Sequence, residues 1–589
     1  MTHMKELFIS VSDSGNHNIP SSTDKNKKKK LFYILLASFL IVGAIIGIVA
    51  GVASRKNNSD AVAHHPVLKS SCSVTRYPEL CYSAIANAPG ATDNLETSKD
   101  VIEKSLNLTI FAVQHNYFTI KKLMKRKGLT KREKCALHDC LEMVDETLDE
   151  LRETEKDIEE YPKKGSLSKA AEDLKILLSA AMTNQDTCID GFSHEEADKN
   201  IRKALLAGQV HVQQMCSNAL AMIKNLTDTD MATERRLNGE RKLMETDEIN
   251  ITTSYGIIFP SWLSVGDRKL LQSSSVTPNV IVAADGSGNY KTVSAAVAAA
   301  PAKSSTRYII RIKAGIYREN VDIPKTKTNI MFLGDGRSST IITGSRNVVD
   351  GSTTFNSATV AAVGAGFLAK DITFQNTAGP SKHQAVALRV GSDLSAFYQC
   401  DMLAYQDTLY VHSLRQFYVK CLVAGTVDFI FGNAASVFQD CDIHARKPNS
   451  GQKNMFTAQG RDDPNQNTGI VIQKCRIGAT SDLLPVQSSF PTYLGRPWKE
   501  YSRTVVMQST LSNVVNSAGW FPWSGTFALN TLYYAEYANT GAGASTSGRV
   551  TWKGFHVIGA TEAAQFTVGK FISGSSWLGA TGFPFSTGL

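Results

Sequence analysis

The stretch YQDTLYVHSLRQFYVKCLVAGTVDFIFGNAASVFQDCDIHA, residues 405–445, carries a repeat that decides how this chain folds. Two series of residues in it and beside it recur at nearly constant spacing. They are Gln384, Gln406 and Asp428, which stand 22 residues apart, and Cys400, Cys421 and Cys441, which stand 21 and 20 residues apart. A period of this length is typical of a solenoid in which each coil supplies short parallel strands. A β-sandwich with coincidental spacing is the alternative, and two series in step favour the solenoid.

The same texture extends over residues 276–589. Short runs rich in Val, Ile and Phe, such as RYIIRI (307–312) and GIVIQKC (469–475), alternate with turns of Gly, Asn, Asp and Ser. Charged helical patterns nearly vanish after SAAVAAAP (294–301). We therefore expect an all-β domain, a parallel β-helix, over residues 276–589.

Two acidic residues of this domain stand among apolar and aromatic neighbours, Asp407 in AYQDTLYVH and Asp428 in TVDFIFG. In a parallel β-helix, residues one coil apart stack at about 4.7–4.9 Å, so Gln384, Gln406 and both acids should meet on one patch. Two close carboxylates do not both ionise easily, so one pKa rises while the other group is held charged. Such a pair supplies an acid and a nucleophile, and the amides can stabilise an oxyanion.

Residues 66–228 have a helical pattern. In CLEMVDETLDELRETEKDIEEY, which begins at Cys140, the apolar residues follow steps of three and four. The short spacing of Cys72 and Cys81 indicates a stapled hairpin at the start of this region. We expect an all-α four-helix bundle tied by disulfides, with no catalytic constellation of its own.

An apolar run of 23 residues, Leu31–Ala53, is long enough to span a bilayer, and KNKKKK (25–30) precedes it. We predict a cytoplasmic tail over residues 1–30 and a transmembrane signal-anchor over residues 31–53. The rest of the chain would then lie in the secretory pathway, as the ten cysteines and the sequons also indicate. The sequons, which all precede residue 271, begin at Asn57, Asn107, Asn225 and Asn250.

A polar, charged linker is predicted over residues 229–275. It contains three basic pairs, in RRLN (from Arg235), RKLM (from Arg241) and RKLL (from Arg268). Paired basic residues in an exposed linker are natural protease targets, and three between two domains favour processing. We expect cleavage near Arg268, Lys269, Leu270 and Leu271.

The positive charge of the chain is concentrated in the β-rich part. Residues 272–589 hold 27 Lys and Arg against 18 Asp and Glu, which gives 27 − 18 = +9. The remainder, 63 − 27 = 36 against 54 − 18 = 36, is neutral. A basic balance suits nucleic acid, anionic membranes or acidic polymers, and no arginine-rich run or zinc-finger spacing supports nucleic acid. An acidic polymer is therefore the expected partner.

Five motifs together resemble the signatures of plant pectin methylesterases, and they occur in that family's order. They are AGIYREN (Gly315, Tyr317, Glu319), HQAVAL (Gln384), YQDTLY (Gln406, Asp407), DFIFG (Asp428) and LGRPW (Arg496, Trp498). The helical region, with CALHDCLEMVDETLDEL and TNQDTCIDGF, is similar to the inhibitor-like pro-region that precedes many of these enzymes. The resemblance covers the chain from about Lys69 to its end.

The resemblance implies a right-handed parallel β-helix that hydrolyses the methyl esters of polygalacturonate and releases methanol. By position, Asp428 resembles the nucleophile, Asp407 the proton donor and base, and Arg496 the partner that keeps Asp428 charged. Gln384 and Gln406 resemble the oxyanion stabilisers. The remaining positions that resemble substrate contacts are Thr354, Tyr410, Phe431 and Trp498.

The family pattern also implies disulfides Cys72–Cys81 and Cys140–Cys188, while Cys135 and Cys216 stay open. In the β-helix the pair Cys421–Cys441 on adjacent coils is favoured, and Cys441–Cys475 is its rival. We expect no metal and no cofactor, because two carboxylates suffice for ester hydrolysis. The implied partners are methyl-esterified pectin, a subtilisin-like processing protease and inhibitor proteins resembling the pro-region. The catalytic part is expected to be a monomer in the cell wall.

Other functions fit the motifs less well. A polygalacturonase is the nearest enzyme alternative, but its Asn-Thr-Asp and Gly-His-Gly motifs are missing, and a serine esterase would need a G-x-S-x-G elbow. A non-catalytic wall-binding or inhibitor protein is the alternative from another class. The acids Asp407 and Asp428, with Arg496, argue against a catalytically dead domain.

Overall fold

A computed structural model describes residues 65–88, 95–162, 166–193, 199–242 and 277–589. Residues Pro66–Leu589 form one compact unit. The predicted cytoplasmic tail (1–30), the predicted signal-anchor (31–53) and the predicted cleavage site at Arg268–Leu271 lie outside the described residues. Within the described ranges, no helix has both the length and the apolar character needed to cross a membrane.

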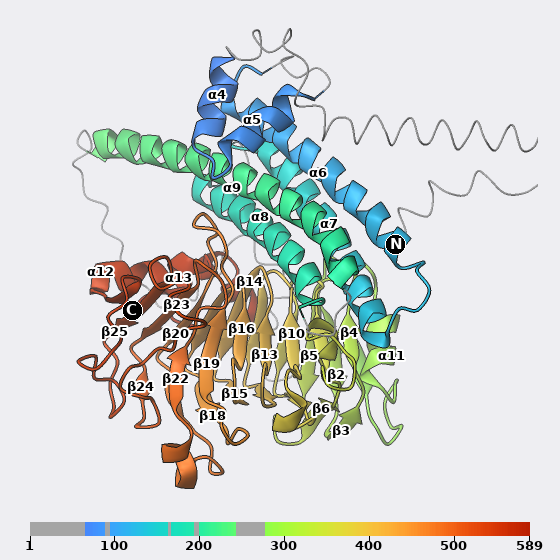
Figure 1. Cartoon of the computed structure of the whole chain (residues 1–589). Coiled ribbons are helices and arrows are strands. Elements are labelled where there is room, and N and C mark those ends of the chain that lie inside the picture. The colour runs from blue at the N-terminus through green and yellow to red at the C-terminus, as the bar shows by residue number, and fades with distance from the viewer. Residues whose placement is uncertain (1–64, 89–94, 163–165, 194–198, 243–276) are drawn as a thin grey trace, which may run out of the picture. The chain divides into compact units, whose positions relative to one another are not determined.

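The N-terminal part of this unit is helical, as predicted. Its helices are α4 (Pro66–Ser73), α5 (Pro78–Ala86), α6 (Ser98–Leu123), α7 (Lys131–Glu160), α8 (Leu167–Asp190) and α9 (Lys199–Lys242). The long helices α6 to α9 pack on one another and form a bundle (Figure 1). Capping boxes begin two of them, with Thr97 and Asp100 on α6 and Thr130 and Glu133 on α7. In each box two backbone N–H groups that the helix leaves unpaired are satisfied by side chains.

Two disulfides tie the bundle where the sequence predicts them. Cys72–Cys81 joins α4 to α5, and Cys140–Cys188 joins α7 to α8. Cys135 and Cys216 are free thiols. Disulfides of this kind are typical of oxidising compartments.

Helix α9 extends beyond the predicted end of the helical region. It continues to Lys242, whereas the sequence predicts that the linker starts at residue 229. The basic pairs at Arg235 and Arg241 therefore lie on helical backbone rather than in a loop. Proteases favour exposed, irregular segments, so this finding makes both pairs poorer targets than their sequence alone indicates.

The C-terminal part is a parallel β-helix, as predicted, built from three sheets in which all paired strands are parallel. One coil contributes a strand to each sheet in turn: β11 (Ser395–Tyr398) to sheet A, β12 (Asp401–Leu403) to sheet B and β13 (Leu409–Val411) to sheet C. The next coil repeats this with β14 (Arg415–Val419), β15 (Leu422–Gly425) and β16 (Ile430–Gly432). In Figure 1 the strands follow one another in chain order along this stack.

The remaining strands extend the three sheets on both sides of these two coils. Sheet A also contains β1 (Val280–Val282), β2 (Tyr308–Ile312), β5 (Ile330–Gly334), β8 (Leu368–Lys370), β17 (Ala435–Gln439), β20 (Gly469–Gln473), β23 (Arg503–Met507), β25 (Tyr533–Tyr537) and β26 (Phe555–Val557). Sheet B also contains β3 (Gly315–Arg318), β6 (Thr340–Gly344), β9 (Thr373–Asn376), β18 (Asp442–Ala445), β21 (Arg476–Ala479) and β24 (Thr510–Leu511). Sheet C, which carries the candidate site, also contains β4 (Val321–Ile323), β7 (Val360–Ala362), β10 (Leu388–Val390), β19 (Asn454–Gln459) and β22 (Thr492–Gly495).

Short helices complete this domain. α11 (Val293–Ala299) packs its apolar side chains into the core of the first coils. Near the C-terminus, α12 (Ala560–Ala563) and α13 (Val568–Phe571) contribute Ala563, Val568 and Phe571 to a second cluster on sheet A. Both ends of the β-rich chain are thus held by apolar packing.

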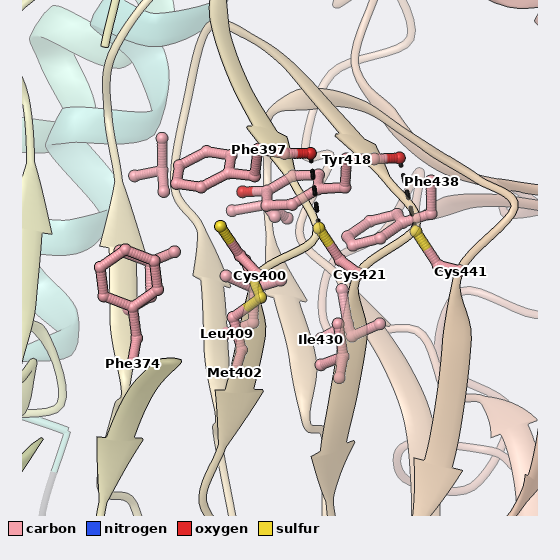
Figure 2. Close-up of a cluster of buried hydrophobic side chains, with 14 of the residues drawn as sticks. Phe374, Phe397, Cys400, Met402, Leu409, Tyr418, Cys421, Ile430, Phe438 and Cys441 are labelled. Carbon is pink, nitrogen blue, oxygen red and sulfur yellow. Dashed lines mark hydrogen bonds between the residues drawn. The ribbon is translucent and has the colours of Figure 1, made fainter. Parts of the chain in front are cut away.

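Aromatic rings stack inside the coils in step with the repeat. Phe397, Tyr418 and Phe438 occupy the same register on β11, β14 and β17, with ring centroids 4.8 and 4.5 Å apart and planes 7° from parallel (Figure 2). Offset-parallel rings of this kind add to the free energy gained by burial. The stack fixes the alignment of neighbouring coils.

The cysteines of the β-helix also form a ladder, but they do not pair, so the predicted Cys421–Cys441 disulfide and its rival Cys441–Cys475 are both wrong. All are buried free thiols. The thiol of Cys421 donates to the Phe397 carbonyl at 3.4 Å, and that of Cys441 to the Tyr418 carbonyl at 3.5 Å (Figure 2). Stacked positions lie about 4.8 Å apart. A disulfide needs Cβ atoms about 3.8 Å apart, so equal spacing along the coils serves a ladder of thiols better than a bond.

Candidate active site

Two aspartates lie in matching turns of neighbouring coils. Asp407 stands two residues before β13, and Asp428 stands two residues before β16. Leu409 pairs in register with Ile430, so the carboxylates occupy equivalent places one coil apart. Both backbones are left-handed, with φ of 62° at Asp407 and 51° at Asp428. Left-handed backbone recurs at several turns of this domain, and aspartate tolerates it better than most residues.

Arg496 binds the second of these carboxylates. It follows directly on β22, and its Nε and Nη2 atoms donate to Oδ1 and Oδ2 of Asp428 at 2.8 and 2.6 Å. This is the bidentate geometry of a charge-assisted pair. The indole of Trp523 lies against the same guanidinium, 4.3 Å from ring centroid to Cζ. The arginine is thereby fixed on two sides.

Asp407 has a different electrostatic environment. Burial, with Asp428 as a second cause, holds the pKa of the Asp407 carboxyl well above its usual range, and Arg496 opposes this shift. Its side chain is nearly inaccessible, at 7 % exposure of the residue. The raised pKa keeps Asp407 protonated up to a higher pH than usual, beside the Asp428 carboxylate that Arg496 binds. A proton donor and a fixed anion one coil apart are what an acyl-transfer reaction requires.

The two predicted amides lie next to this pair. Gln406 precedes Asp407 in the same turn, and the backbone carbonyl of Gln406 accepts from the backbone N–H of Ala385 at 3.2 Å. Gln384 lies in the preceding coil, and the backbone carbonyl of Gln384 accepts from the backbone N–H of Val348 at 3.1 Å. Both side chains are half-buried. Backbone bonds thus set the amides on successive coils, as the repeat predicts.

An aromatic row crosses sheet C beside the acids. Tyr410 and Phe431 stack with centroids 4.2 Å apart, and the ring of Phe431 meets that of Trp498 edge-on at 6.0 Å. Gly460 makes room for this indole, because a Cβ there would stand 2.9 Å from its ring. Thr354, also predicted as a contact, is half-buried at the start of a short 3-10 turn, Phe355–Ser357. In the described part of the chain, no group of His, Cys, Asp or Glu is arranged to hold a metal ion.

Comparison with known proteins places this geometry in a family. The family described as pectinesterase matches residues 279–575, and the family described as plant invertase/pectin methylesterase inhibitor matches residues 66–222. The chain belongs to the pectinesterase family. It is 69% identical to pectinesterase 1 of Citrus sinensis, with 100% of each chain covered. It is 66% identical to pectinesterase/pectinesterase inhibitor 3 of Arabidopsis thaliana, with 100% of this chain and 99% of the relative covered.

A solved structure agrees with the β-helix. The pectin methylesterase from carrot is 81% identical, with a TM-score of 0.53, and covers 54% of this chain and 100% of its own. By family the chain is therefore a pectin methylesterase preceded by an inhibitor-like region. The carrot chain, whose whole length matches 54% of this chain, is a folded protein.

In this pectinesterase the bundle lies on the aromatic row. Thr187 of α8 lies 3.5 Å from the Tyr410 hydroxyl and 2.9 Å from Nε2 of His412. One turn earlier, Thr183 accepts from the side chain of Asn433 at 2.9 Å. Burial lowers the pKa of His412 to about 3, so this imidazole is neutral. Tyr410 and Phe431 retain only 3% and 4% exposure, which closes the face of sheet C around the acids.

Sequence reasoning missed two residues of the pectinesterase site. Trp523, in GWFPWSG (519–525), keeps 37 % exposure although its ring lies on Arg496. A tryptophan in a Pro- and Gly-rich turn just beyond LGRPW was the available signal. Arg389 of β10, in register with Tyr410, carried no signal in a single sequence, because only its place in the sheet gives it meaning.

Proposed function

We propose that this chain hydrolyses methyl esters of homogalacturonan through a covalent acyl intermediate on Asp428. The observation that carries the proposal is the pair of aspartates in equivalent turns, one gripped by Arg496 at 2.8 and 2.6 Å and the other with a raised pKa. The two acids are thereby in different states before substrate arrives. Membership of the pectinesterase family supports the same reaction.

In the first half of the reaction, a carboxylate oxygen of Asp428 attacks the carbonyl carbon of the methyl ester. The electron pair of the carbonyl moves to its oxygen, which the amides of Gln384 and Gln406 stabilise by hydrogen bonds. When the C–O bond to the methoxy group breaks, Asp407 gives its proton to that oxygen, and methanol leaves. An anhydride between Asp428 and the sugar carboxyl remains.

In the second half, Asp407 is ionised and acts as the base. It takes a proton from water, whose oxygen attacks the acyl carbon. The bond to Asp428 then breaks, which frees the galacturonic acid and restores both aspartates; the acid loses its proton to solvent and leaves as the carboxylate. Arg496 keeps the leaving Asp428 anionic and placed, while Tyr410, Phe431 and Trp498 provide ring faces for the sugar chain, with Thr354 as a further contact.

The test is a product assay on the full chain with a specific protease site placed within residues 243–276, cut and then freed of the bundle. Incubated with highly esterified pectin, it should release methanol without new reducing ends. Formation of reducing ends instead would assign a glycosidase such as a polygalacturonase. Neither product from folded protein would support the wall-binding or inhibitor alternative.

We further propose that the bundle holds the enzyme inactive until the linker is cut. The support is that α8 lies against Tyr410 and His412, so a polymer cannot reach the aromatic row of the uncut chain. Because α9 carries the two earlier basic pairs on helical backbone, the cut is assigned to Arg268–Leu271. A subtilisin-like protease of the secretory pathway would act there.

The proposed route follows from these features. The predicted anchor holds the precursor at the membrane, and cleavage releases a basic enzyme into the cell wall. Separate inhibitor proteins that resemble residues 66–222 would then be able to take the place of the bundle. If the uncut chain demethylates pectin as fast as the cut and separated enzyme, restraint by the bundle is refuted.

A further inference from the structure

Arg389 is a buried arginine whose hydrogen-bonding capacity is largely unused. Its side chain retains 5 % exposure, yet Nε and Nη1 have no hydrogen-bond partner in the described structure. The third donor, Nη2, binds Oε1 of Glu142 on α7 at 3.2 Å. Buried donors without partners are costly, so such a group usually indicates a ligand or a functional state not present.

The position of Arg389 relates it to the reaction centre. On sheet C it stands in register with Tyr410 on β13, which stands in register with Phe431 on β16. Arg389 is thus two coils from Phe431, or about 10 Å at the usual strand spacing. Its guanidinium lies over the ring of Phe355, with Cζ 3.4 Å from the centroid, which restricts where the donors can point. A polymer crossing the coils along the aromatic row would meet these donors beyond the reacting sugar.

Lys325, just after β4 on the same sheet, has a similar arrangement. Its Nζ atom lies 2.8 Å from Oδ2 of Asp145 and 2.6 Å from Oδ2 of Asp149. Both carboxylates belong to α7, as Glu142 does. Among the ion pairs of the described residues, Lys325 and Arg389 have acidic partners only on the bundle.

Two other arginines of the β-helix have a carboxylate partner inside their own domain. Arg415 binds Asp393 at 2.6 Å in addition to a contact with the bundle, and Arg549 binds Glu536 at 2.7 Å. When the bundle leaves, those arginines keep a carboxylate. Arg389 and Lys325 lose their carboxylate partners on α7. The substrate-facing sheet then carries two cations that can bind another anion.

The partner that α7 supplies is a row of carboxylates. Glu142, Asp145 and Asp149 stand three and four residues apart, which places them along one side of the helix. At 1.5 Å of rise per residue they span about 10 Å. A de-esterified stretch of a galacturonan also presents carboxylates at regular intervals along a line.

We propose that Arg389 and Lys325 form a subsite for the free carboxylates of partly de-esterified galacturonan, and that Glu142, Asp145 and Asp149 of α7 occupy it while the bundle is attached. The inference rests on the proposed function and adds the form of the substrate to it. An anion in this subsite belongs to a sugar further along the chain than the reacting ester, so the enzyme favours esters that lie near sugars already demethylated. Arginine suits this role because its planar fork matches a carboxylate.

The experiment uses the full chain with a cleavable linker, cut and freed of the bundle. For each variant, kcat/KM is measured on partly de-esterified pectin and on a fully methyl-esterified oligogalacturonate, and their ratio is compared. Arg389→Gln should lower the ratio about tenfold, the scale of one charge-assisted hydrogen bond, through KM rather than kcat. Arg389→Lys keeps the charge and should retain most of the ratio. A fully de-esterified hexamer should inhibit Arg389→Gln correspondingly less.

The matched control is Arg311→Gln, which removes the same charge from an exposed site on sheet A. Equal loss on both substrates, or a ratio no lower than that of Arg311→Gln, overturns the subsite. If Arg389→Gln does not fold, Lys325→Gln, whose side chain is 26% exposed, carries the same test. Absence of methanol with the parent enzyme on either substrate would refute the proposed function itself, which is a different outcome.

Discussion

Two regions of this molecule pair acidic side chains with cations in different ways. In the turns before β13 and β16, Asp428 is bound by Arg496 of the same domain, and the stacked coils hold Asp407 beside it. On helix α7, Glu142 and Asp145 are paired with Arg389 and Lys325 of the other domain.

Pairing within one domain suits a reaction centre, whereas pairing across the domain boundary suits a surface that the bundle regulates. A pair that is balanced within one domain keeps its geometry when the domains part, so the reaction centre is ready on release. Ion pairs that cross the boundary exist only while the bundle is docked. Removing one partner leaves the other charge uncompensated, and the energy of that change falls on docking rather than on folding.

The largest effect is expected where the first region is broken. Asp428→Asn keeps the shape of the side chain but cannot form the acyl intermediate, so methanol release by the cut enzyme should fall below detection. Circular dichroism and the unfolding midpoint should match the parent. Activity above roughly a tenth of the parent level would remove Asp428 from the role of nucleophile.

Asp407→Asn tests the other member of the same pair. The amide cannot protonate methanol, so kcat should fall by about 10²–10⁴-fold. Because burial raises the pKa of Asp407 and the reaction uses its protonated form, ionisation of this group should limit the rate on the basic side of the profile rather than on the acidic side. A substrate with a better leaving group than methanol should recover part of the loss. Equal loss on both esters would assign Asp407 a structural role.

Much of the first region could be predicted from the sequence, because a coil repeat converts spacing directly into neighbourhood. Asp407 and Asp428 are 21 residues apart and do occupy equivalent turns. The same logic failed for Cys421 and Cys441, since equal spacing brings thiols close without bringing them to bonding distance. The repeat therefore predicts which residues stack, and the side-chain geometry decides what the stacked groups do.

The second region was not predictable in the same way. The helix pattern of α7 indicates which residues are acidic and on one side, but nothing in the chain connects Glu142 with Arg389, 247 positions away. No repeat relates the two domains, so their pairing depends on docking alone. The end of α9 at Lys242 was missed for a local reason, because its last turns are polar and resemble a charged linker.

A change of pH should alter the affinity with which the bundle docks on the β-helix. Burial at the docked boundary raises the pKa of Asp139 and of Asp462 to about 7 each. A raised folded-state pKa favours docking at low pH. This contribution is complete below the free-state pKa of about 4 and is lost as the pH rises through about 7. Affinity of the cut bundle for the β-helix should therefore fall about tenfold or more over that window.

The groups around these two acids define the controls. Asp139 accepts from Thr353 and faces Asn356, Glu142 and Arg389, while Asp462 accepts from Gln213 and faces Asp186, Lys499, Arg76 and Glu500. Asp139→Asn should flatten the pH dependence by preserving a neutral side chain. Titration calorimetry of the separated parts at several pH values provides the measurement. An affinity that rises with pH over the same window would contradict the expected direction.

A smaller effect is expected from one cross-boundary pair. Glu142→Gln in the uncut chain removes the anion that occupies the donor edge of Arg389, so residual methanol release should rise about two- to fivefold, since Glu142 is partly exposed. Glu153→Gln is the matched control, because Glu153 lies on the same helix, is 52% exposed and pairs only with Lys156 in the described structure. Equal activity of the two variants would show that the pair does not contribute to restraint.

The smallest effect concerns the cysteines, which also divide between the two regions. The bundle closes two disulfides, whereas the β-helix keeps Cys400, Cys421, Cys441 and Cys475 as thiols. Cys421→Ala should therefore cost only about 1 kcal/mol of unfolding free energy, the scale of a small loss from the core. Loss of a disulfide would cost about 2–5 kcal/mol. Thiol counting on the denatured, unreduced β-helix should find all four groups, and two fewer would mean that secretion oxidises a pair after all. Activity of the cut enzyme should be unchanged, because the ladder lies in the core behind sheet A and Asp407 and Asp428 do not depend on it.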